Sequence, residues 1–66
     1  MEEIGSILKQ RRKELGLRQV EVGKETGINI SRLSLIENTW VRPRRQEVHR
    51  IEAALERLSS GNQKDS

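Results

Sequence analysis

Apolar residues recur at intervals of three, four and seven along the chain, the spacing that places side chains on one face of an α-helix. These recurrences predict four helices, over about residues 2–15, 18–26, 30–38 and 44–58. No alternating β-branched run bounded by turns is present, so the predicted fold class is all-α. The apolar faces predict a core of Ile4, Leu8, Leu15, Val22, Leu33, Ile36, Val48, Ile51, Leu55 and Leu58.

Glycine, asparagine and proline mark the expected ends of these helices. Gly16 and Gly27 each follow a predicted helix and can take the left-handed conformation that ends it, without a Cβ penalty. Asn29 is placed to cap the next helix with its side-chain oxygen. Pro43 favours a helix start and excludes a helix interior.

Composition limits the function classes. The 66 residues include no cysteine and one histidine, which excludes disulfides and cysteine nucleophiles and argues against a metal site. No carboxylate pair or nucleophile–base set occurs at useful spacing, so we expect no enzyme activity and no cofactor. No apolar stretch has the length of a membrane span or a secretory signal, and cytoplasmic residence is expected by default. One domain over residues 1–58 is predicted, followed by a disordered polar tail over residues 59–66.

The charges are distributed unevenly. Thirteen lysines and arginines against 10 acidic residues give a net charge of +3, which by itself is weak evidence for a nucleic-acid partner. The distribution predicts one basic face, of the kind that binds phosphate groups. The basic residues gather in two runs, Lys9, Arg11, Arg12 and Lys13, and Arg42, Arg44 and Arg45.

Residues 16–43 give the clearest indication of function. Two short helices joined by a glycine turn are typical of a helix-turn-helix, whose second helix enters the major groove of DNA. The segment and its flanks show a characteristic joint spacing of Ile4-Gly5, Leu8, Arg12, Gly16-Leu17-Arg18-Gln19, Val22-Gly23, Gly27-Ile28-Asn29, Leu33-Ser34-Leu35-Ile36-Glu37 and Pro43. In this spacing, over about residues 4–58, the chain resembles the Cro and phage-repressor helix-turn-helix family (XRE-like). The resemblance implies a compact four-helix, lambda-repressor-like domain that binds double-stranded DNA.

Three positions depart from the family pattern. Arg18 stands where a Thr or Ser cap is usual, so the second helix should be less well capped. Gly23 replaces an alanine, which permits close approach but costs about 1 kcal/mol in helix propensity. Thr39 occupies a usual glycine position, so we expect Asn38 to take the left-handed conformation instead.

The predicted third helix exposes five residues that are candidates for contact with DNA bases. Arg32 in its first turn has the donors to bind guanine O6 and N7, or alternatively clamps a phosphate or faces solvent. Two apolar members of the set can pack on thymine methyl groups, although one of them can instead join the core. The five are Ile30, Ser31, Arg32, Ser34 and Leu35.

A second set of residues is expected to contact DNA phosphates. Gln19 opens the second helix, where the resemblance implies a phosphate contact and the helix N-terminal amides favour an anion. The resemblance also implies contacts after the third helix, to which amide and guanidinium groups are suited. The set consists of Arg18, Gln19, Asn38, Arg42, Arg44 and Arg45. Arg12 and Glu37 differ from these, because the resemblance implies a structural ion pair between the first and third helices.

The single tryptophan, Trp40, has three possible roles: covering the core, packing at a dimer interface, or touching the DNA backbone. His49 is expected at the surface or an interface. If the protein is a homodimer, its interface should use Ile51, Leu55 and Leu58, with Val41 or Trp40. Such an interface would be small, so we expect weak self-association without DNA.

The favoured function is a sequence-specific transcriptional regulator, a repressor that binds a palindromic operator as a homodimer. The alternative is an antitoxin or adaptor, a protein-interaction module that binds a partner protein through its fourth helix. The basic residues 42–45 beside a polar helix face favour the regulator, because an adaptor has no need of them.

Overall fold

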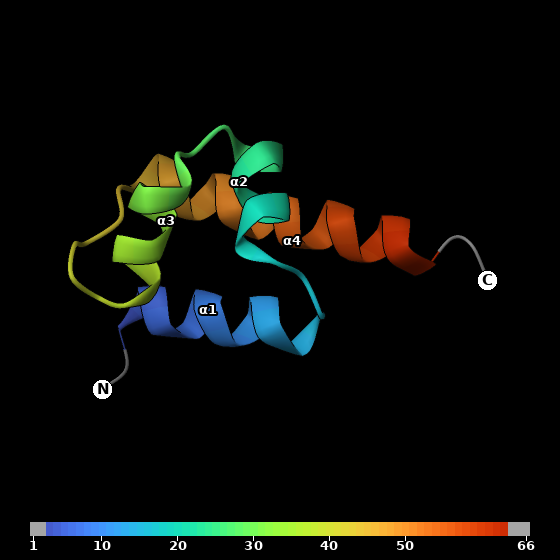
Figure 1. Ribbon diagram of the computed structural model, residues 1–66, viewed down its shortest axis with the longest axis horizontal. Helices are drawn as coiled ribbons and strands as arrows, with labels where there is room; N and C mark the ends of the chain where they lie inside the picture. Colours follow the sequence, from blue (N-terminus) through green and yellow to red (C-terminus); the bar gives the residue numbers. More distant parts are fainter. Residues whose placement is uncertain (1–2, 64–66) are drawn as a thin grey trace.

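Four helices form the computed structural model, which describes residues 3–63 (Figure 1). α1 packs against α3 and α4, and α2 packs against the same two helices. No strand occurs between residues 3 and 63, so the all-α prediction is confirmed over that range. The helices are α1 (Ile4–Glu14), α2 (Gln19–Thr26), α3 (Ile30–Glu37) and α4 (Arg45–Gln63).

The two glycine turns and the asparagine cap form as predicted. Gly16 and Gly27 both have positive φ, at 71° and 77°. The side-chain oxygen of Asn29 accepts the backbone N–H of Ser31 at 2.8 Å and caps α3. α2 and α3 therefore meet at a fixed, tight turn.

The start of α2 is capped from within the helix. The side chain of Arg18 makes no cap, as its chemistry requires, but its backbone N–H donates to Oε1 of Glu21 at 2.7 Å. α4 begins in the same way, since the backbone N–H of Arg44 donates to Oε1 of Glu47 at 2.7 Å. In both helices a glutamate three residues after an arginine performs half of a capping box.

The core lies between the four helices, and most of its predicted members are buried. Buried as predicted are Leu8, Val22, Leu33, Ile36, Ile51 and Leu55. Val48 and Leu58 are half-buried, and Leu58 packs against the core cluster. Removing these side chains from water provides the main driving force for folding.

The core prediction was wrong at both ends of α1. Ile4 and Leu15 are exposed, because they flank the part of the helix that the other helices cover. Leu17 and Ile28 are buried in their place. Each directly follows a left-handed glycine, and the turn folds it back against the core, the apolar contact that often accompanies this type of helix end.

α4 extends further than its apolar pattern predicts. Helix was expected to end near residue 58, yet it continues through Gln63, so residues 59–63 of the expected disordered tail are helical. Backbone hydrogen bonding can continue past the last apolar side chain, and no proline follows to end it. Residues 64–66 of that tail lie outside the described residues.

The turn after α3 corrects a second prediction. Asn38 has φ −91°, and Thr39 itself takes the left-handed conformation, with φ 62°. A β-branched residue adopts this region at a cost of about 1–2 kcal/mol. The backbone reverses at this position, where a glycine is usual, so Thr39 takes the left-handed conformation although it has a Cβ.

Candidate nucleic-acid interface

A buried hydrogen-bond network joins α1, α2 and α3. Nε and Nη2 of Arg12 donate to the two carboxylate oxygens of Glu37 at 2.8 and 3.0 Å, which forms the predicted ion pair. Nη1 of Arg12 donates to the backbone carbonyl of Leu17 at 2.7 Å. Gln19 donates through Nε2 to Oε1 of Glu37 at 3.0 Å. The network therefore fixes the start of α2, and Gln19 with it, beside the end of α3.

The outer face of α3 exposes two large apolar side chains. Ile30 and Leu35 are 45% and 42% exposed, so neither joins the core and that alternative is wrong. Ser31 is exposed and Ser34 is half-buried between them. Four of the five candidate base-contacting residues thus form one surface on a short helix, with methyl groups and hydroxyls available to a ligand.

The fifth candidate, Arg32, is paired within the protein. Its Nε donates to Oε2 of Glu47 at 2.7 Å, and its Nη2 donates to Oε1 at 2.9 Å. The hydrogen bond from Arg32 is the largest cause that lowers the pKa of Glu47 to about 2, and the same bond raises the pKa of Arg32 above its ordinary value. Glu47 was missed by sequence reasoning, because the two residues are 15 positions apart. Only the crossing of α3 and α4 brings them together.

The candidate phosphate-contacting arginines are available for a ligand. All four are exposed at the starts of α2 and α4 and in the loop before α4. None of their guanidinium groups forms an ion pair with a carboxylate of residues 3–63. They are Arg18, Arg42, Arg44 and Arg45.

Asn38 lies at the other end of α3 and connects it to α1. Its Nδ2 donates to the backbone carbonyl of Ser34 at 3.0 Å. Its Oδ1 accepts a hydrogen bond from Nζ of Lys9 at 3.4 Å. The amide of Asn38 and the ammonium group of Lys9 therefore lie beside the C-terminal end of the exposed α3 face.

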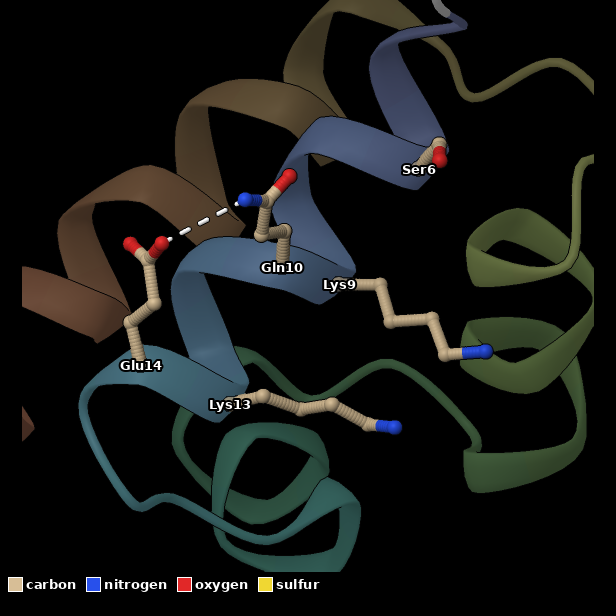
Figure 2. A pocket seen from close by; sticks show the side chains of 5 residues that line it. All are labelled: Ser6, Lys9, Gln10, Lys13 and Glu14. Carbon is tan, nitrogen blue, oxygen red and sulfur yellow. Dashed lines mark hydrogen bonds between the residues drawn. The ribbon is translucent and has the colours of Figure 1, made fainter.

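Two lysines of α1 belong to the same region, although sequence reasoning did not include them among the contact residues. Figure 2 shows Lys9 and Lys13 extending in the same direction from α1, Lys9 toward α3. They line a shallow pocket with Ser6, Gln10 and Glu14. The four-residue spacing of the lysines within the first basic run places them on one helix face and could have identified them.

Trp40 and the expected dimer surface need correction. Trp40 is 77% exposed, so it does not cover the core. Ile51 and Leu55 are almost fully buried and belong to the core of the monomer, where they cannot form an interface. His49 is exposed on α4, as expected. Of the residues considered for dimer contact, Trp40 offers the most accessible apolar surface.

Residues 3–63 contain no cluster of three histidine, cysteine or acidic side chains that could hold a metal ion. Within the same part of the chain, no helix has the length and apolar character needed to cross a membrane.

Comparison with known proteins gives the family. Searches of curated proteins and of solved structures return no match. A family model described as a helix-turn-helix domain matches residues 3–60, which includes all four helices up to Ser60 of α4. The match indicates a DNA-binding regulator, a class that is typically non-enzymatic. The chain therefore belongs to the helix-turn-helix family of the XRE/Cro-like type.

Proposed function

We propose that the protein is a sequence-specific transcriptional repressor that binds a palindromic operator as a homodimer. α3 enters the major groove, which is wide enough to admit one helix. The observation that supports this most strongly is the exposed face of α3, where Ile30, Ser31 and Leu35 are accessible and the ammonium group of Lys9 lies beside the C-terminal end of the helix.

Base readout uses the outer face of α3. Ile30 and Leu35 pack on thymine methyl groups, which only the major groove presents. Ser31 and Ser34 donate to or accept from base edges, and Arg32 donates to a guanine.

Phosphate contacts surround this face and set its position on the duplex. Arg42, Arg44 and Arg45 bind one strand from the loop and the start of α4. Arg18 and Gln19 at the start of α2, with Asn38 at the end of α3, bind the backbone on the other side. The fixed position of Gln19 beside Glu37, at 3.0 Å, supports this assignment because the side chain is already ordered before DNA arrives.

Repression and dimer formation follow from simple requirements. A small domain that occupies an operator can exclude other proteins from it without any further contact, whereas activation requires a contact to the transcription machinery. A twofold dimer places two α3 helices about 34 Å apart, one turn of DNA, so its target is palindromic. The loop that contains Trp40 forms the dimer contact, and the small area of that loop makes the dimer weak without DNA.

Selection of bound sites from random double-stranded DNA tests the proposal. We expect enrichment of an inverted repeat whose half-sites lie about 34 Å apart. Contacts to about six phosphates should lower the logarithm of the association constant with a slope of roughly −5 against the logarithm of salt concentration. If no sequence is enriched and binding does not depend on salt, the regulator proposal is wrong, and the alternative of a partner-binding adaptor is supported.

Replacing Arg44 with alanine tests the phosphate assignment separately. Arg44→Ala should weaken binding to all sequences alike and reduce the salt slope by about one, because one phosphate contact is lost. The backbone N–H that caps α4 remains, so the fold is preserved. Arg57→Ala is the matched control, since Arg57 pairs with Glu25 far along α4. Equal salt slopes for Arg44→Ala and the control would contradict the assignment.

A further inference from the structure

The hydrogen bonds between Arg32 and Glu47 leave part of the arginine unused. A guanidinium group has five N–H donors in a rigid planar fork. Nε and Nη2 face the carboxylate of Glu47 at 2.7 and 2.9 Å and form the side edge of the fork. Nη1 donates no hydrogen bond to any of the described residues. The end edge, formed by Nη1 and the second N–H of Nη2, is therefore available to a ligand.

Arg12, which is buried and holds helices together, uses its N–H donors differently from Arg32. Arg12 uses Nε, Nη1 and Nη2 for Glu37 and the carbonyl of Leu17, and its side chain is 10% exposed. The side chain of Arg32 is 36% exposed, and Nη1 lies outside the pair. Both arginines are held by a bidentate carboxylate, but only Arg32 keeps a parallel pair of donors on its accessible side.

Glu47 is itself held in place. Its Oε1 accepts the backbone N–H of Arg44 at 2.7 Å, which fixes the carboxylate at the N-terminus of α4. The hydrogen bond from Arg32 and that cap hold the pKa of Glu47 at about 2, so it is ionised at neutral pH. Among the described residues, no other side-chain hydrogen bond joins α3 to α4. The orientation of Arg32 is therefore set by a carboxylate that cannot turn away without breaking the cap.

We propose that Glu47 is a positioning residue for base recognition: it holds the Nε–Nη2 edge of Arg32 and thereby presents the Nη1–Nη2 edge to O6 and N7 of one guanine in the operator. Arg32 is the third residue of α3, in the turn that meets base edges in this motif. Guanine presents two acceptors in the major groove that match two parallel donors. An unrestrained arginine would lose several rotamers on binding, and the pair with Glu47 removes that loss beforehand.

The inference rests on the proposed function, and one substitution separates the two. Glu47→Gln keeps an oxygen that can accept the N–H of Arg44, but it loses the charge and the second acceptor for Arg32. Binding is measured on the operator selected for the wild-type protein and on every single-base-pair variant of it. We expect discrimination for one guanine to fall about tenfold in Glu47→Gln, the size of one good bidentate base contact. Affinity for sequences without that guanine should stay the same or rise, because a negative charge beside DNA is removed.

Two further variants identify the path of the effect. Arg32→Ala should abolish the same discrimination, and adding Glu47→Gln to it should change nothing more, since Glu47 acts through Arg32. Arg32→Lys retains a cation that can bind a phosphate but lacks the fork, so it should lose the guanine preference and keep most of the general affinity. The Arg32→Lys variant also tests the proposal if the Glu47→Gln protein does not fold. Glu25→Gln is the matched control, because it breaks the exposed pair with Arg57 at 2.8 Å instead.

The results for these variants distinguish the possible roles of Glu47 and Arg32. If Glu47→Gln weakens all sequences alike and leaves the guanine preference intact, Glu47 only stabilises the fold and the inference is wrong. If the preference increases, Glu47 competes with DNA for Arg32, which also contradicts it. If Arg32→Lys keeps the preference and Arg32→Ala loses affinity uniformly, Arg32 binds a phosphate. Failure of the wild-type protein to select any site would instead refute the proposed function.

Discussion

Replacing Arg12 with methionine is expected to lower the free energy of unfolding by about 3–5 kcal/mol, the cost of leaving a buried charge without its partner. The side chain of Glu37 is 2% exposed and would keep only the hydrogen bond from Gln19. The backbone carbonyl of Leu17 would also lose its donor. Total stability is on the order of 3–10 kcal/mol for a chain of 66 residues, so this loss removes much of it. The melting temperature should fall by about 15 °C or more in thermal unfolding followed by circular dichroism.

Two control variants show whether the unpaired charge is the cause. Arg12→Met combined with Glu37→Met should recover much of the stability, because no buried charge remains without a partner. Arg57→Met removes an arginine of the same type from an exposed pair with Glu25, and should cost only about 0–1 kcal/mol. An Arg12→Met protein that melts at the wild-type temperature would show that the pair contributes nothing to the fold.

The features that were predictable from sequence are local or depend on glycine. Gly16 and Gly27 indicate left-handed turns because they lack a Cβ, and Asn29 indicates a cap because its oxygen reaches the next turn of backbone. Arg12 and Glu37 are 25 positions apart, and only the family resemblance connected them. Spacing alone contains no information on which two charges meet across a helix crossing.

The errors share the same physical origin. A periodic pattern shows which side of a helix is apolar, but not how much of that side the neighbouring helices cover. Ile4 and Leu15 lie on the apolar side of α1 and are nevertheless exposed, whereas Ile51 and Leu55 are taken up by the core and cannot form a dimer contact. Trp40 has no periodic context at all, so its exposure could be known only from the structure.

One part of the candidate interface was predictable from the sequence and another part was not. The members of α3 that face outward followed from the helix period, and their exposure agrees with it for Ile30 and Leu35. The partner of Arg32 did not follow, because it depends on where α4 begins after Pro43. A glutamate three residues after Arg44 indicates only a helix cap from the sequence. Its second role, toward α3, requires the tertiary structure.

Gly5→Ala is expected to destabilise the protein by about 3 kcal/mol, at the upper end of the cost of overpacking. A Cβ at Gly5 would overlap the backbone carbonyl oxygen of Ile36, which cannot rotate away as a side chain would. α1 and α3 would have to separate, and the separation would strain the nearby Arg12–Glu37 hydrogen bonds.

Gly23→Ala is the matched control, because its Cβ would lie 3.2 Å from the carbonyl oxygen of Ile28. Both substitutions replace a helical glycine by alanine, so the difference between their urea midpoints reports how far the overlap at Gly5 exceeds the milder contact at Gly23. Equal midpoints would mean that α1 and α3 do not approach each other closely at Gly5.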